Sequence, residues 1–141
     1  MRAVIQRAAQ ARCQVGGRQI SGFEGEGLVV LLGVTHADAA PQAERMARKI
    51  SQLKLLRGDR SALEAAAPVL LISQFTLYAE TRKGRKPSWS KAAPAAQAAP
   101  LVEQVAVALE QCGLEVGRGV FGADMLIALA NDGPVTLIVD T

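Results

Sequence analysis

Short apolar runs separated by glycine-containing turns dominate the first quarter of the chain. Val4-Ile5 lies between basic residues and predicts a strand. Gly16-Gly17, with apolar residues on both sides, predicts a hairpin. The continuous run of leucine, valine and glycine over 28–34 predicts a buried strand.

Two later segments carry the three- and four-residue spacing of amphipathic helices. The first follows Asp38 and Pro41, and its apolar face consists of Ala43, Met46, Ala47, Ile50 and Leu53. The second begins near Pro94 or Pro100 and ends at Gly113, with a buried face of Leu101, Val105, Ala108, Leu109 and Cys112.

The order of the remaining elements suggests the fold class. Apolar runs predict further strands at 54–56, 69–72, 114–116, 125–130 and 135–139, whereas 58–67 is typical of a loop. No regular strand–helix–strand alternation occurs. We therefore expect a single α+β domain over 1–141, with a barrel-like, largely antiparallel or mixed sheet and two packed helices.

Composition narrows the class of protein further. The chain has 141 residues, 50% of them hydrophobic, and a formal net charge of +3, as in a globular protein that tolerates a phosphate-rich partner. No apolar run approaches the ~20 residues of a membrane span, so a cytoplasmic protein without a membrane partner is expected. Cys13 and Cys112 lack metal-ligand spacing and fit buried apolar positions, so we expect neither a metal nor a cofactor.

Candidate chemistry is concentrated in two polar segments that interrupt apolar strands. His36 is the only histidine, which makes a histidine-based triad improbable. Ser73-Gln74-Phe75-Thr76 directly follows a strand. It is either a functional site, with side chains and amides exposed at the strand end, or an ordinary strand whose polar face contacts water. Asn131-Asp132-Gly133-Pro134 is either a second site or a hairpin turn at Asp132-Gly133. The Gly-Pro bond belongs to the one class that adopts cis geometry readily.

A basic loop lies between these segments. Its cations can neutralise phosphates and its tryptophan can stack on a base, although a solubilising loop has the same composition. The residues are Arg82, Lys83, Arg85, Lys86, Trp89 and Lys91.

Read together, the segments resemble the D-aminoacyl-tRNA deacylase family over nearly the whole chain. Two stretches, Ser73 to Ala79 and Asn131 to Thr136, resemble its signatures. Four others match in order: Met1 to Arg7, Leu31 to Val34, Lys83 to Ser88 and Phe121 to Met125.

The resemblance implies a homodimeric hydrolase that removes D-amino acids from the 3′-terminal adenosine of tRNA. Ser73, Gln74 and Thr76 would form the catalytic segment, and Phe75, Phe121, Met125 and Arg7 would bind or brace the substrate site. Gly133 and Pro134, joined by a cis bond, would enter the partner's pocket and reject L-amino acids. Lys83, Arg85 and Lys86 would bind tRNA.

Two mechanisms are compatible with these residues. The 2′-hydroxyl of the substrate can assist hydrolysis while backbone amides stabilise the oxyanion, or Thr76 can act as a nucleophile without an activating histidine. We favour the first. Because glycine has no side chain to reject, glycyl-tRNA, including glycine mischarged on tRNA-Ala, is also an expected substrate.

The chain departs from the family pattern in places outside both signatures. The 57–68 segment is shorter than in the family and lacks the usual acidic, glycine-containing hairpin. Glu80, Trp89 and Val120 stand where the family usually has Asp, Phe and a basic residue, respectively. Two rival functions stay open: a noncatalytic RNA-binding module, and a different ester or amide hydrolase on the same fold.

Overall fold

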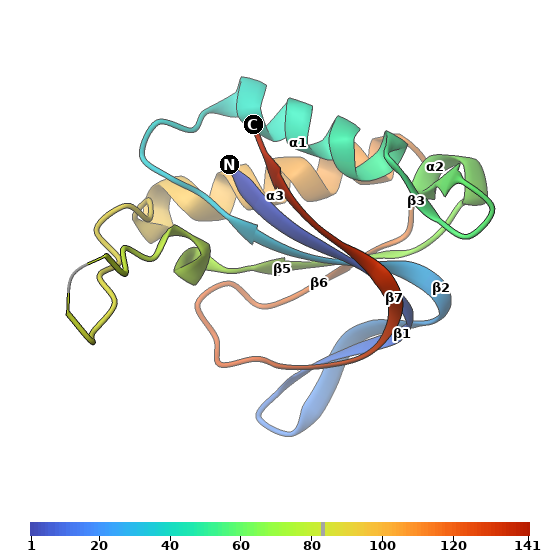
Figure 1. Cartoon of the computed structure of the whole chain (residues 1–141), viewed down its shortest axis with the longest axis horizontal. Helices are drawn as coiled ribbons and strands as arrows, with labels where there is room; N and C mark the ends of the chain where they lie inside the picture. Colours follow the sequence, from blue (N-terminus) through green and yellow to red (C-terminus); the bar gives the residue numbers. More distant parts are fainter. Residues whose placement is uncertain (83) are drawn as a thin grey trace.

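A five-stranded mixed sheet forms the centre of the computed structural model, which describes residues 1–82 and 84–141 (Figure 1). Its order is β6-β5-β2-β1-β7. The β1–β2 and β1–β7 pairs are antiparallel, whereas β2–β5 and β5–β6 are parallel. The bounds are β1 Arg2–Val15, β2 Arg18–Gly33, β5 Val69–Ser73, β6 Val116–Arg118 and β7 Leu126–Asp140.

The expectation of a barrel-like sheet is wrong. Closure requires the first and last strands to pair with each other, but in the described part of the chain β6 and β7 are the two edges. Strand β6 has only 3 residues, which pair with β5 alone. The long β7 therefore keeps one edge free of intramolecular pairing.

Helices α1 (Ala40–Gln52) and α3 (Ala95–Gln111) pack together over one face of the sheet (Figure 1), as their apolar spacing predicts. Gly113 ends α3 in the left-handed region, and the Leu114 amide donates to the Leu109 carbonyl at 3.2 Å. Within the described residues, no helix combines the length and apolar character that crossing a membrane requires.

The predicted loop at 58–67 contains regular structure. Strand β3 (Lys54–Leu56), which was expected, pairs with β4 (Arg60–Ser61), and a third helix, α2 (Ala62–Ala65), follows. The Ser61 hydroxyl accepts a hydrogen bond from the Glu64 amide while the Glu64 carboxylate accepts one from the Ser61 amide. This capping box stabilises a helix too short for periodicity to reveal.

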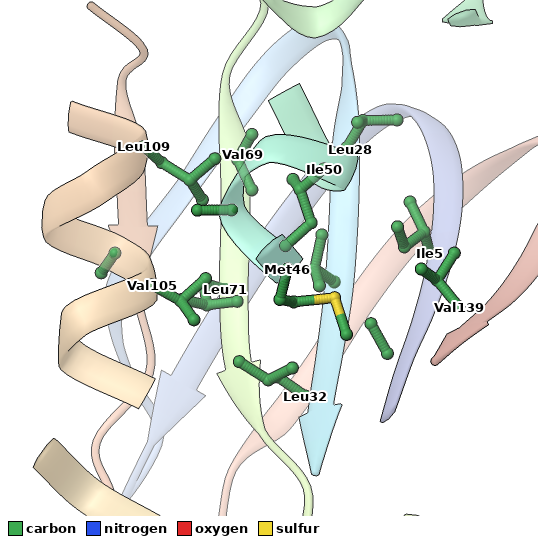
Figure 2. Close-up of a cluster of buried hydrophobic side chains, with 14 of the residues drawn as sticks. Ile5, Leu28, Leu32, Met46, Ile50, Val69, Leu71, Val105, Leu109 and Val139 are labelled. Carbon is green, nitrogen blue, oxygen red and sulfur yellow. The ribbon is translucent and has the colours of Figure 1, made fainter. Parts of the chain in front are cut away.

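Buried side chains occupy both faces of the sheet. On the helix face, Met46, Ile50, Val105 and Leu109 pack against Ile5, Leu28, Val69 and Leu71 (Figure 2). The alternate residues Val29, Leu70 and Ile72 point to the opposite face, where a smaller cluster includes Cys13. Cys112, expected in the core, is exposed at the end of α3.

The two polar segments adopt conformations that strand pairing imposes. Strand β5 ends at Ser73, and Phe75–Tyr78 forms a 3-10 helix, η1, so the reading of an ordinary continuing strand is wrong. The segment 131–134 lies within β7, so the reading of a hairpin turn is also wrong. Its register changes from Gln6↔Thr136 to Ala8↔Asn131, so the four residues 132–135 lie opposite Arg7 alone and form an irregular bulge.

Candidate functional site

A cavity of about 320 Å³ opens at the carboxyl end of β5. The segment from Ser73 to Phe75 forms one wall, and the loop from Phe121 to Met125 forms another. Further apolar lining residues are Leu32 of β2, Val34 just after that strand, and Ala98 and Val102 of α3. The structure thus brings together two motifs that are far apart in the sequence.

The start of η1 presents unused backbone donors beside this cavity. The Gln74 amide donates to the Leu32 carbonyl at 2.8 Å, which fixes the segment to β2. The first amides of a helix lack intrahelical acceptors, and among the described residues those of Phe75 and Thr76 have no backbone partner. Of these two residues, Phe75 lines the cavity, so at least its unpaired amide lies beside the cavity wall.

Thr76 differs in position from its neighbours. Its hydroxyl accepts a hydrogen bond from the Gln74 side-chain amide. Ser73, Gln74 and Phe75 line the cavity, whereas Thr76 is not among the lining residues described. Of the three residues expected to be catalytic, Ser73 and Gln74 therefore line the cavity, and the Thr76 hydroxyl is hydrogen-bonded to the Gln74 side chain.

Aromatic and thioether groups surround the cavity. Phe75 is 56% exposed and meets Trp89 edge-on, with ring centroids 5.5 Å apart. Phe121 is also exposed on the opposite wall. Met125 lies over Gly119, where an added Cβ would be 2.6 Å from the Met125 sulfur. These apolar groups suit the flat face of a base or a broad range of side chains.

The basic loop adjoins this site through the Phe75–Trp89 contact. Arg85 and Lys86 are exposed, and Lys83 lies outside the described residues. The Lys91 ammonium is 2.6 Å from Glu80. Hydrogen bonds from Lys91 and the Arg82 amide hold the pKa of the Glu80 carboxyl below its usual value. Glu80 thus neutralises part of the positive charge of the loop.

Other reactive side chains lie apart from the cavity. The His36 imidazole is 3.0 Å from the Ser90 carbonyl and is exposed. In the described ranges, no three histidine, cysteine or acidic side chains gather where a metal ion could bind.

Arg7 holds the bulge in β7 through hydrogen bonds to its backbone carbonyls. Arg7 Nε donates to the Asp132 carbonyl at 3.0 Å, and Nη2 donates to the Gly133 carbonyl at 3.1 Å. Nη1 donates to the Leu55 carbonyl at 3.3 Å, and the residue is only 8% exposed. The Gly133-Pro134 bond is cis, and both residues are exposed.

Asp132 in this bulge has a further partner, Arg57, which the sequence did not indicate. The Asp132 carboxylate binds Arg57 through two hydrogen bonds, with Arg57 Nε at 2.9 Å. The two residues are separated by 75 positions. No local sequence pattern indicates such a pair, and Arg57 lies at the start of the shortened 57–68 segment, to which the sequence assigned no role.

Comparisons with known proteins agree with this geometry. The family model for D-Tyr-tRNA(Tyr) deacylase matches residues 4–140. Proteins named D-aminoacyl-tRNA deacylase from Acidothermus cellulolyticus and Kineococcus radiotolerans are each 56% identical over 140 residues, covering 99% of both chains.

Solved structures share the fold. A c-Myc DNA Unwinding Element Binding Protein superposes with a TM-score of 0.91 at 35% identity, covering 100% of this chain and 99% of its own. A probable eukaryotic D-amino acid tRNA deacylase, 15% identical, gives a TM-score of 0.87 over 99% of this chain and 98% of its own. Because the family model spans nearly all residues and the curated relatives are more than half identical, this chain belongs to the D-Tyr-tRNA(Tyr) deacylase family.

Proposed function

We propose that this chain hydrolyses the ester bond of D-aminoacyl-tRNA and releases free tRNA and the D-amino acid, acting in the cytoplasm. The names of the similar proteins support this reaction. The observation that carries the proposal is the exposed Gly133-Pro134 segment, whose carbonyls Arg7 fixes in place. Two backbone carbonyls that are held in fixed positions can form a rigid wall, which a site needs in order to distinguish D-amino acids from L-amino acids.

Discrimination follows from the geometry of the α-carbon. When the ammonium and ester groups are held, D and L residues differ only in the direction of the side chain. A backbone wall along one direction clashes with L side chains, and rejection by clash is an effective source of specificity. Glycine makes no clash, so glycyl-tRNA, including glycine mischarged on tRNA-Ala, is a further substrate.

A homodimer supplies this wall to the pocket. Gly133 and Pro134 are exposed and are not among the residues lining the cavity of their own chain. The same strand exposes Leu126 at 66% and Ile138 at 70%. Exposed apolar side chains flanking the segment support a subunit interface. The partner's Gly133-Pro134 segment then closes the pocket.

Hydrolysis proceeds with assistance from the substrate. The cavity holds the terminal adenosine and amino acid, and water attacks the ester carbonyl beside the ribose 2′-hydroxyl. The Phe75 and Thr76 amides stabilise the oxyanion. The C–O ester bond then breaks, and the ribose 3′-oxygen leaves as a hydroxyl, with the neighbouring 2′-hydroxyl passing to it the proton that the water gives up. Arg85 and Lys86, with Lys83, bind the phosphates near the 3′ end. The position of Thr76 behind Gln74 favours this route over threonine attack, so Thr76→Ala slows but does not abolish turnover.

The test compares D-Tyr-tRNA and L-Tyr-tRNA side by side in the presence of EDTA. We expect rapid loss of the D ester alone. Equal hydrolysis of both esters would contradict the proposed rejection of L side chains by the Gly133-Pro134 segment. Inhibition by EDTA would contradict a mechanism without a metal ion. Binding of tRNA without hydrolysis of either ester would indicate the RNA-binding module instead.

A further inference from the structure

The Asp132 carboxylate lies between two guanidinium groups. Arg7 Nε is 3.1 Å from Asp132 Oδ2, and Arg57 binds both carboxylate oxygens from the other side. The Asp132 side chain is 17% exposed, compared with 67% for Arg57. Arg57 thus covers a carboxylate that directly precedes Gly133.

Arg57 is itself held in position by the loop joining β3 to β4. Its amide donates to Glu26 Oε1 at 2.7 Å, and its carbonyl accepts from Arg60 Nε at 3.1 Å. Arg60 Nη2 also donates to Glu26 Oε2 at 3.2 Å. Since Glu26 belongs to β2, the loop is tied to the central sheet, and the position of the guanidinium is constrained despite its exposure.

Arg7 has two competing acceptors in this arrangement. Its Nε contacts both the Asp132 carbonyl and the Asp132 carboxylate, whereas Nη2 binds the Gly133 carbonyl. A carboxylate attracts a guanidinium more strongly than a neutral carbonyl does. Because Arg57 satisfies the carboxylate, Arg7 can keep its donors on the backbone carbonyls.

We propose that Arg57 is a positioning residue that acts through Asp132 to hold the Gly133-Pro134 wall and thereby sets selectivity for D over L esters. The inference rests on the proposed function. Its support is geometric, and the electrostatics agree, since hydrogen bonding by Arg57 lowers the pKa of the Asp132 carboxyl. Without Arg57, the carboxylate draws Arg7 away from the Gly133 carbonyl and the wall shifts.

The experiment measures kcat/KM for D-Tyr-tRNA and L-Tyr-tRNA with Arg57→Gln. We expect the ratio of kcat/KM for the D ester to kcat/KM for the L ester (the D/L ratio) to fall about fivefold. This factor corresponds to the free-energy contribution of a strong, partly exposed ion pair. The matched control is Arg2→Gln, which removes a similar two-bond pair to Asp140, at 2.9 and 3.0 Å, at the carboxyl end of β7. Its D/L ratio should equal that of the wild type.

A double-mutant cycle tests whether Arg57 acts through Asp132. In Asp132→Asn, which keeps the shape but removes the charge, adding Arg57→Gln should change the D/L ratio no further. An unchanged ratio in Arg57→Gln, equal losses for both esters, or full additivity with Asp132→Asn would overturn the inference. A wild-type protein without D/L selectivity would instead overturn the proposed function.

Discussion

Arg7 shows how one buried side chain connects three segments of the chain. Its guanidinium donates to carbonyls of Leu55, Asp132 and Gly133. A planar group whose donors are spread over three nitrogens is suited to this role, whereas a lysine ammonium carries all its donors on one nitrogen. The sequence places Arg7 beside the first strand, but only the family resemblance suggested its contact with the Gly-Pro segment.

At the residue scale, Gly133→Ala distinguishes a functional wall from a structural bulge. A Cβ at Gly133 would contact only Asn131 Nδ2 at 3.4 Å, and the backbone is not in the left-handed region. The free energy of unfolding, measured by thermal denaturation, should therefore change by less than about 1 kcal/mol. Hydrolysis of D-Tyr-tRNA should fall about 10- to 100-fold, because the methyl group enters the partner's pocket. Unchanged turnover would contradict the proposed role.

Tyr78 provides a prediction about pH dependence. Burial, followed by the charges of Asp38 and Asp140, raises the pKa of Tyr78 from 10.0 to about 12. A raised phenol pKa means that folding favours the neutral form. Its contribution to stability is complete below pH 10 and is lost as the pH rises toward 12.

Tyr78 is the single tyrosine, so an ultraviolet titration of phenolate absorbance reports it alone. We expect ionisation of the folded protein near pH 12 and of the urea-unfolded protein near pH 10. Coincident titrations, with circular dichroism showing the native fold retained, would contradict the prediction.

At the scale of elements, the site depends on the close approach of β2 to η1. An added Cβ at Gly33 would lie 3.0 Å from the Gln74 carbonyl oxygen and 3.1 Å from Leu77 Cβ. Only glycine allows the end of β2 to support the segment that bears the free amides.

Gly33→Ala should therefore displace η1. We expect destabilisation of about 1–3 kcal/mol by urea unfolding and a loss of kcat for D-Tyr-tRNA larger than the loss of tRNA affinity. A variant with native stability and native kcat would show that η1 tolerates the displacement.

At the scale of the whole molecule, the exposed face of β7 is the surface through which we propose that two subunits associate. We expect sedimentation equilibrium to give twice the chain mass of 14.8 kDa. Ile138→Asp places a charge at an exposed apolar position and should yield folded monomers. These monomers should lose D/L selectivity, because no partner supplies the Gly133-Pro134 wall. Monomers with full selectivity would contradict action across the interface.

Local patterns were sufficient for most elements of the fold. The spacing of Ala43, Met46 and Ile50 predicted α1, and Gly16-Gly17 predicted the β1–β2 turn, which the register confirms. Both signals arise from neighbouring residues, whose burial follows helix or strand periodicity. The capping box of α2 was also present in the sequence, although its few residues carried no periodic signal.

Tertiary structure decided the features that depend on distant partners. The sequence by itself determined which polar segments interrupt the strands, and the resemblance assigned them a role. Strand register decided that residues 132–135 bulge opposite Arg7, 125 positions from Asp132. Packing also brought Arg57 to Asp132 and left the sheet open. Hydrophobic periodicity reports only whether a residue is buried, whereas pairing across the sheet selects which side chains meet.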